Sequence, residues 1–151
     1  MPQSLAETYF HIIFSTKDRV PFLRDRTLRD ELHTYIGGAC RNLKSPSLTV
    51  GGVEDHVHIL CRFGRTITIA DLLKGLKKES SKWIKGKDRS LYNFHWQAGY
   101  GIFSTDSDRL PELRRYIAAQ EEHHRQESFK DELRRLLTAH HAEYDERYVW
   151  D

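Results

Sequence analysis

The stretch GGVEDHVHIL, residues 51–60, decides the fold and also raises the question of function. In it Val57 and Ile59 alternate with His56 and His58, and this period of two predicts a β-strand with both imidazoles on one face. Two adjacent neutral imidazoles can share one divalent cation, or they can be polar residues on the outer face of a sheet. The spacing alone leaves both interpretations open and does not identify a metal.

Further strands and helices are predicted on both sides of this stretch. Residues 8–16 are β-branched and aromatic and predict a strand, and residues 24–43 carry apolar side chains at helical spacing. Two strands surround a turn near residues 52–55, where Asp55 either ends the turn or accepts a hydrogen bond that fixes a histidine tautomer. The later predicted elements are a helix over residues 69–85, a strand over 93–105, a helix from about 108 to 126 and a helical piece over 128–141.

This order of elements predicts an α+β fold of the ferredoxin-like kind. A βαββαβ order forms a split antiparallel sheet with helices on one face, and here a C-terminal helical extension follows it. We expect one domain over residues 1–151, with a core of about 8–126 and an extension over 127–151. Since many functions use this fold, the fold alone does not indicate one.

Charge is distributed unevenly along the chain. The net charge is only +2, but residues 74–89 hold seven Lys or Arg and two acidic residues. Such a basic face can bind a nucleic-acid backbone, or it can simply be solvated. The lysines that we expect to contact DNA are Lys74, Lys77, Lys78, Lys82 and Lys85.

Targeting signals are not visible in the sequence. The chain has no basic leader before an apolar run, no apolar window long enough for a membrane span and only two cysteines. We therefore expect a cytoplasmic protein with no membrane partner.

The predicted third helix carries candidates for further chemistry. In LRRYIAAQEEHH, residues 113–124, Tyr116 and Gln120 lie four residues apart and share one helix face. Gln120 could offer a carbonyl oxygen to a hard cation, with Tyr116 beside whatever the cation binds. Alternatively, Tyr116 is a packing residue and Gln120 is solvated. His123 and His124 are rival candidates for a metal ligand.

Several separated segments together resemble one known family. DHVHIL, HIIFSTKDR at residues 11–19, LLKGLKKESSKWI at 72–84, WQAGYGIFS at 96–104 and the Tyr-x-x-x-Gln pattern are similar to the single-tyrosine HUH transposases of small insertion sequences. Their REP-associated relatives share the same core. The resemblance runs from about residue 9 to residue 126.

The resemblance implies a mechanism and a set of partners. It makes Tyr116 the nucleophile and His56, His58 and Gln120 the ligands of a divalent metal, with Mg²⁺ or Mn²⁺ expected and Zn²⁺ also acceptable to imidazoles. The implied reaction cleaves and rejoins single-stranded DNA at hairpin-containing element ends through a 5′-phosphotyrosine intermediate. A homodimer is implied as well, in which the tyrosine helix of one subunit can complete the site of the other.

Three alternatives remain at this stage. The first is a non-catalytic ferredoxin-like module that binds single-stranded nucleic acid through its lysines and exposed aromatic residues. The second is a small hydrolase in which His56 and His58 hold a metal that activates water. The third is a domesticated relative of the transposases that nicks hairpins and mobilises nothing.

Overall fold

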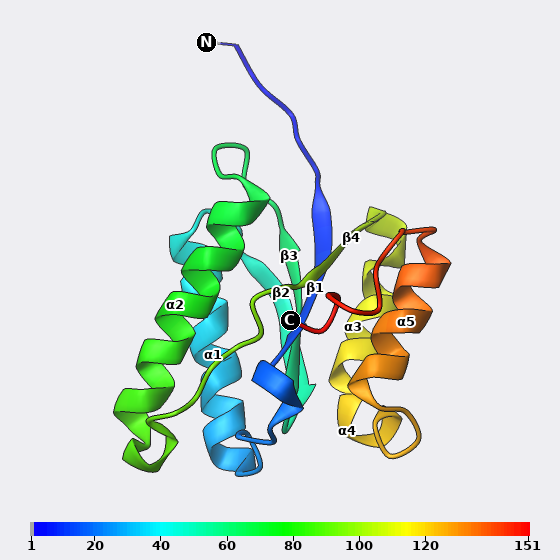
Figure 1. The fold of residues 1–151 in the computed structure, drawn as a ribbon. Coiled ribbons are helices and arrows are strands. Elements are labelled where there is room, and N and C mark those ends of the chain that lie inside the picture. Colours follow the sequence, from blue (N-terminus) through cyan, green and yellow to red (C-terminus); the bar gives the residue numbers. More distant parts are fainter. Residues whose placement is uncertain (1) are drawn as a thin grey trace.

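A computed structural model describes residues 2–151, and its fold is the predicted α+β fold with a four-stranded antiparallel sheet. Helices flank the sheet in two groups, as Figure 1 shows. The strands and helices are β1 (Tyr9–Ser15), α1 (Arg26–Asn42), β2 (Ser47–Val53), β3 (His56–Arg62), α2 (Ile69–Lys87), β4 (Gly101–Thr105), α3 (Leu110–Ala118), α4 (Gln120–His123) and α5 (Phe129–Ala139).

The sheet has the strand order β2-β3-β1-β4, and every neighbouring pair is antiparallel. This is the order of a split βαββαβ sheet, so the predicted topology is confirmed. The strand β1 lies at the centre beside β3, and β2 and β4 form the two edges. In the register, Ser15 lies opposite His56 and Ile13 lies opposite His58, which places the histidines next to the middle strand.

Helices α1 and α2 cover one face of the sheet. The main apolar core lies between them and the strands, and it takes Ile12 and Phe14 from β1 together with Val57 and Ile59 from β3. Both helices begin at the capping side chains that their sequences offer. Asp25 accepts hydrogen bonds at the start of α1, and Thr68 accepts one at the start of α2.

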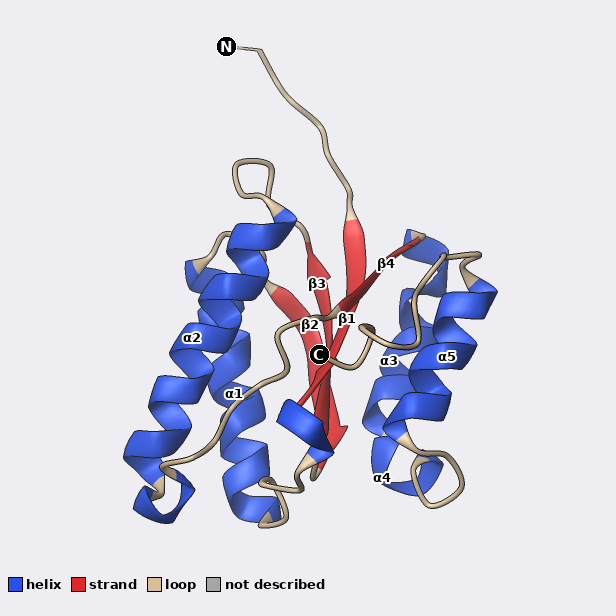
Figure 2. Ribbon diagram, viewed as in Figure 1, coloured by secondary structure: helices blue, strands red, loops and turns tan. Residues whose placement is uncertain are grey.

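Helices α3, α4 and α5 lie on the other face of the sheet, as Figure 2 shows. Ile13, which alternates with Ile12 and Phe14, points to this side and joins a second apolar cluster with Phe103, Phe129 and Leu133. The predicted layer of helices on one face of the sheet therefore corresponds to α1 and α2. The third helix and the C-terminal extension form a second layer that covers the face bearing the histidines.

Two elements are shorter than their sequences predict. Of the strand predicted over residues 93–105, only β4 forms. In the segment before it, the Gln97 N–H donates to the Ser15 carbonyl, and the carbonyls of residues 97–99 accept hydrogen bonds from Lys77 Nζ. The helix predicted as far as residue 126 is interrupted at Ala119, where φ is −95° and ψ is 17°. Within residues 2–151, no helix combines the length and the apolar character that crossing a membrane requires.

Candidate metal and tyrosine site

The two histidines of β3 point toward the layer of α3, α4 and α5, and both are fully buried. Each ring is oriented by a contact at its Nδ1 atom. His58 Nδ1 lies 2.8 Å from His11 Nε2, and His56 Nδ1 lies 2.7 Å from an oxygen of Asp55. Asp55 therefore orients a histidine ring, which is one of its two predicted roles, and both Nε2 atoms are left to face the helices.

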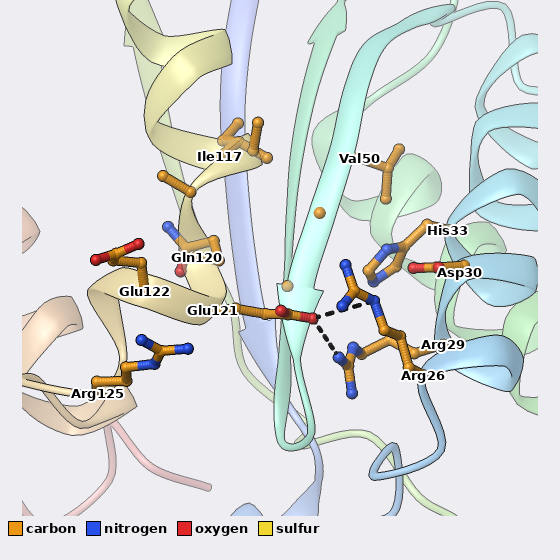
Figure 3. A pocket seen from close by; sticks show the side chains of 14 residues that line it. Arg26, Arg29, Asp30, His33, Val50, Ile117, Gln120, Glu121, Glu122 and Arg125 are labelled. Carbon is orange, nitrogen blue, oxygen red and sulfur yellow. Dashed lines mark hydrogen bonds and ion pairs between the residues drawn. The ribbon is translucent and has the colours of Figure 1, made fainter.

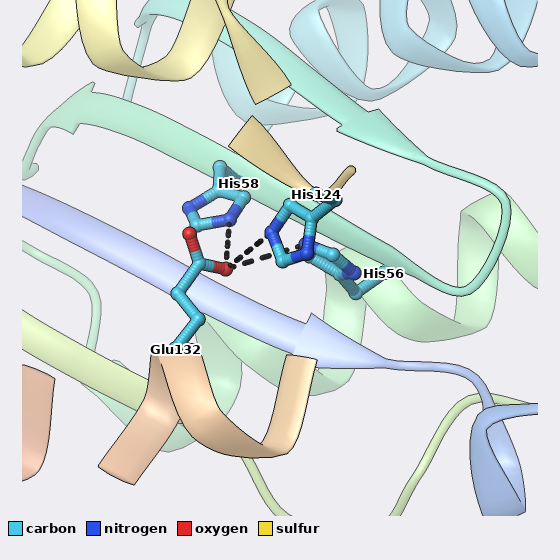
Figure 4. Close-up of side chains that lie close together, drawn as sticks. All are labelled: His56, His58, His124 and Glu132. Carbon is cyan, nitrogen blue, oxygen red and sulfur yellow. Dashed lines mark hydrogen bonds and ion pairs between the residues drawn. The ribbon is translucent and has the colours of Figure 1, made fainter. Parts of the chain in front are cut away.

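A glutamate from the C-terminal extension meets these Nε2 atoms. Glu132 lies on α5 and is fully buried, and Figure 4 shows its carboxylate among the histidines. Its Oε1 atom accepts hydrogen bonds of 2.9 Å from Nε2 of His58 and of His124, and it lies 3.4 Å from Nε2 of His56. The carboxylate is therefore the centre of a polar cluster that lies between the sheet and α5.

We call His56, His58, His124 and Glu132 the histidine–glutamate cluster. Each residue offers one ligand atom, and these atoms all lie within 4.8 Å of one another. His56 Nε2 is buried and makes no hydrogen bond within residues 2–151, although it faces the cluster. Three imidazole nitrogens and one carboxylate are a suitable donor set for a divalent transition metal, so the residues present fit a metal ion.

The protonation of the cluster follows from burial and from its carboxylates. Burial lowers the pKa of His58 to about 4, so this ring is neutral. Burial also disfavours a charge on His56, but the carboxylates of Asp55 and Glu132 outweigh it and raise the pKa of His56 to about 9. Burial opposes ionisation of Glu132 as well, yet the three histidines around its carboxylate hold its pKa well below the ordinary value. The metal-free cluster thus contains a buried ion pair.

The tyrosine of α3 reaches the same cluster. The phenol of Tyr116 donates a hydrogen bond to Glu132 Oε2, and Arg135 Nη2 donates one of 2.8 Å to the phenol oxygen. The rings of Tyr116 and His58 have centroids 5.9 Å apart. Burial and the contact with Glu132 raise the pKa of Tyr116 above its ordinary value, so the phenol is protonated in this arrangement. One chain alone therefore brings together the phenol and the histidine pair.

Gln120 is buried but makes no hydrogen bond to the cluster. Its amide nitrogen donates to the carbonyl of Tyr116 at 3.3 Å, and its Oε1 atom has no hydrogen-bond partner within the described part of the chain. Gln120 as a metal ligand therefore stays a prediction from the resemblance. Of the two rival histidines, His124 lies in the cluster, whereas His123 contacts Glu127 at 2.7 Å.

The predicted DNA-binding lysines lie on α2, which is on the sheet face opposite Tyr116. Lys77 is engaged locally, since its Nζ atom donates to three carbonyl oxygens of residues 97–99 at 2.7–3.0 Å. Lys74, Lys78 and Lys82 are exposed, and Lys85 is half-buried. Their role in DNA binding stays a prediction, and any strand that they hold must pass around the sheet to reach the tyrosine.

Sequence reasoning did not find Glu132 or Arg135. A signal for Glu132 is nevertheless present, because it follows Phe129 by three residues and precedes Leu136 by four, which places a carboxylate in the apolar stripe of α5. A charged residue on the buried face of a helix is rarely there without a partner. The identity of that partner depends on how α5 packs, which the local sequence does not encode.

An open pocket of about 560 Å³ adjoins the tyrosine on the side of β4. It lies between β4, α3 and α5, and Tyr116, Phe103, Arg109, Arg135 and His140 are among its lining residues. Phe103 and His140 stack with ring centroids 4.5 Å apart. The pocket gives the phenol a route to solvent that is bordered by two arginines.

Comparison with known proteins shows the family to which this chain belongs. Residues 4–120 match the model of a family of transposases. That family is described as "Transposase IS200 like", and the chain belongs to it. The match ends before His124 and Glu132, so the cluster combines residues of the family region with residues beyond it.

Two solved structures share the fold. One is a proposed transposase of Deinococcus radiodurans R1, which is 20% identical, covers 80% of this chain and 95% of its own, and has a TM-score of 0.61. The other is a REP-associated tyrosine transposase bound to a REP hairpin, which is 13% identical, covers 79% of this chain and 70% of its own, and has a TM-score of 0.55. No protein of curated function matches the sequence.

Proposed function

We propose that this transposase cleaves and rejoins single-stranded DNA at hairpin-containing ends through a 5′-phosphotyrosine formed on Tyr116. The observation that carries the proposal is the meeting of the phenol with the histidine–glutamate cluster through Glu132. The hairpin in the REP-associated relative supports the class of substrate. Residues 1–151 act as one domain in which the extension over 127–151 completes the site.

The reaction exchanges one phosphate ester for another. The phenol oxygen of Tyr116 attacks phosphorus, the bond from phosphorus to the 3′ oxygen breaks, and the phenol proton is finally carried by the released 3′-hydroxyl. A second 3′-hydroxyl later attacks the phosphotyrosine and restores the phenol. Because the ester is conserved at each step, the reaction needs no nucleotide triphosphate, in agreement with a sequence that has no GxxxxGK[ST] loop.

The side chains around the phenol have separate tasks. Arg135 donates to the phenol oxygen and would stabilise the phenolate as attack develops. Glu132 is held ionised by the histidines and accepts the phenol hydrogen bond, so it orients the hydroxyl, and its lowered pKa makes it a poor base for the phenol proton. His123 Nε2 lies 3.5 Å from the phenol oxygen, and because it donates to the Glu127 carboxylate at 2.7 Å it is not an acceptor for the phenol proton in this arrangement.

His56, His58, His124 and Glu132 are the residues that would hold a divalent cation. Such a cation supplies polarisation of a phosphate oxygen and neutralisation of its charge. Among the expected metals, a site with three imidazoles favours Mn²⁺ or Zn²⁺ over Mg²⁺, which prefers oxygen ligands. Gln120, the ligand that the resemblance implies, would extend this set if its side chain turned toward the cluster.

A covalent-adduct assay tests the proposal. The protein is incubated with labelled single-stranded hairpin oligonucleotides and Mn²⁺ or Mg²⁺, and the products are separated on a denaturing gel. We expect label at the mass of the protein, its loss in Tyr116→Phe and with a chelator, and its retention in Tyr92→Phe, which alters a tyrosine that is 77% exposed.

Other outcomes separate the alternatives. Hydrolysis of the oligonucleotide that survives Tyr116→Phe would favour a metal-dependent hydrolase in which water is the nucleophile. Binding without any adduct, lost on Lys78→Met, would favour a non-catalytic module. Either result would contradict a tyrosine transposase mechanism.

A further inference from the structure

A fourth histidine extends the histidine–glutamate cluster toward the tyrosine. His11 lies on β1, next to β3, and its side chain is only 4% exposed. Its Nε2 atom lies 2.8 Å from Nδ1 of His58, and the two rings stack with centroids 5.0 Å apart. Because Nε2 of His58 contacts Glu132 at 2.9 Å, the three residues Glu132, His58 and His11 form one continuous chain of hydrogen bonds.

The far end of this chain reaches the pocket of about 560 Å³ beside β4, which we call the tyrosine pocket. His11 and Tyr116 both line it, and their ring centroids lie 6.4 Å apart. The Nδ1 atom of His11 has no hydrogen-bond partner within residues 2–151, and it is not sealed from solvent. Since Nε2 points to His58, Nδ1 is the nitrogen that a ligand in this pocket can reach.

The pocket on the other side of α3 does not share this connection. It lies beside β2, and Figure 3 shows that Arg29 and Glu121 meet there, at a distance of 2.6 Å. Neither His11 nor Tyr116 is among the residues that line it. A phosphate that Tyr116 attacks must therefore enter through the tyrosine pocket, where Arg135 stands beside the phenol.

The positions of the ring protons without a metal follow from the partners of each nitrogen. Burial lowers the pKa of His11 to about 3 and that of His58 to about 4, so each ring is neutral and carries one proton. The carboxylate of Glu132 can only accept, so the proton of His58 is on Nε2. His58 Nδ1 is then an acceptor, the proton of His11 is on Nε2, and His11 Nδ1 presents a lone pair to the pocket.

Ligation of a cation by His58 reverses this order. Nε2 of His58 must give its lone pair to the ion, so its proton leaves to water and the ring is protonated at Nδ1 instead. The proton that His11 shared with His58 supplies Nδ1 of His58, and water in the pocket supplies one to Nδ1 of His11. One proton is released and one is taken up, so both rings stay neutral, and His11 now presents an N–H donor to the tyrosine pocket.

We propose that His11 is a positioning residue that couples metal binding in the histidine–glutamate cluster to phosphate binding in the tyrosine pocket. A lone pair at Nδ1 repels a phosphate oxygen, whereas an N–H at the same atom donates a hydrogen bond to it. The DNA strand is then held more tightly at Tyr116 when the ion is in place. The inference rests on the proposed function and adds an order to it, in which the metal prepares the pocket for the strand.

Nuclear magnetic resonance of protein with ¹⁵N-labelled histidine tests the proton positions, because a protonated ring nitrogen resonates far from a bare one. Spectra are recorded with a chelator and with equimolar Zn²⁺, which is diamagnetic, and the signals lost in His11→Gln or His11→Asn identify His11. We expect its proton on Nε2 with the chelator and on Nδ1 with Zn²⁺. His95, which is exposed and outside the cluster, should show no change. A His11 ring that is unchanged by Zn²⁺ would overturn the inference.

Fluorescence anisotropy with a labelled hairpin oligonucleotide tests the coupling in Tyr116→Phe protein, which forms no adduct. Zn²⁺ should tighten binding, and this gain should be about tenfold larger with His11 than with the further change His11→Gln, as one hydrogen bond to a charged group predicts. The glutamine oxygen can still accept from His58, so calorimetry should show that Zn²⁺ binding is retained. Equal gains in both proteins would overturn the coupling.

The inference and the proposed function can fail separately. An adduct on Tyr116 of the unaltered chain, together with a His11 proton that stays in place, would overturn the inference and leave the transposase mechanism intact. A proton that moves when Zn²⁺ binds, with the expected gain in oligonucleotide affinity but no adduct, would support the role of His11 and contradict the proposed chemistry.

Discussion

Replacement of Glu132 by glutamine tests whether the histidine–glutamate cluster is a buried ion pair in the metal-free protein. Glutamine keeps the size of the side chain and removes its charge. Breaking a buried pair by removing one partner costs about 3–5 kcal/mol. Asp55 still contacts His56 after the change, at 2.7 Å, so we expect a loss near the lower end, about 3 kcal/mol of unfolding free energy.

The dependence of this loss on pH follows from the two shifted pKa values. The pKa of Glu132 is lowered, so its contribution is present above the ordinary 4.5 and is lost as the pH falls. The pKa of His56 is raised from 6.5 to about 9, so its contribution is complete below 6.5 and is lost as the pH rises toward 9. The difference between the wild type and Glu132→Gln should therefore be largest between pH 4.5 and 6.5.

Urea unfolding at pH 6 with a chelator measures the effect. The matched control is Glu146→Gln, which removes an exposed carboxylate paired with Arg134 and should leave stability almost unchanged. A loss in Glu132→Gln no greater than that of the control would refute the buried pair. A gain in stability would refute it as well, because it would mean that the carboxylate is a net burden without metal.

Three further outcomes are expected. At one hundred times its Kd, Mn²⁺ should raise the unfolding free energy by about 2.7 kcal/mol, and His124→Ala should lose most of this stabilisation. Calorimetry should show that Mn²⁺ binds more weakly as the pH falls, because protons compete with the metal for the imidazoles. Because Tyr116 meets the cluster within one chain, a mixture of His58→Ala and Tyr116→Phe chains should form no adduct, whereas recovered adduct would support the shared site that the resemblance implies. Arg109→Gln, beside the tyrosine pocket, should weaken hairpin binding in fluorescence anisotropy more than Lys82→Gln on α2, and the reverse order would place the strand on the α2 face.

The histidine side of the site could be predicted because it depends on local geometry. The alternation of His56 and His58 with Val57 and Ile59 fixes which side chains share a face, and the structure has the apolar pair in the main core and the imidazoles on the other side. Strand order was equally accessible, since βαββαβ allows few arrangements. Tyr116 was found through the resemblance, because a tyrosine at helical spacing has no special meaning by itself.

The remaining part of the site depends on contacts between elements distant in sequence. Glu132 reaches the histidines because Phe129 and Leu133 pack against Ile13 and Phe103, and no local pattern reports this docking. The local hydrogen bonds of Lys77 could not be predicted for the same reason. Its three carbonyl partners belong to a segment twenty or more residues later, where a regular strand was expected.

The two helical layers also constrain how DNA can use this protein. The phenol, Arg135, His11 and the tyrosine pocket lie on the α3–α5 side of the sheet. A strand that enters this pocket can place a phosphate at Tyr116 and beside His11 without reaching α2. Lys74, Lys78 and Lys82 of α2 are exposed, and we propose that they hold duplex or stem phosphates farther along the same DNA, where they would add affinity that is sensitive to salt and indifferent to sequence. Affinity and the positioning of the scissile phosphate would thus arise on opposite faces of one sheet.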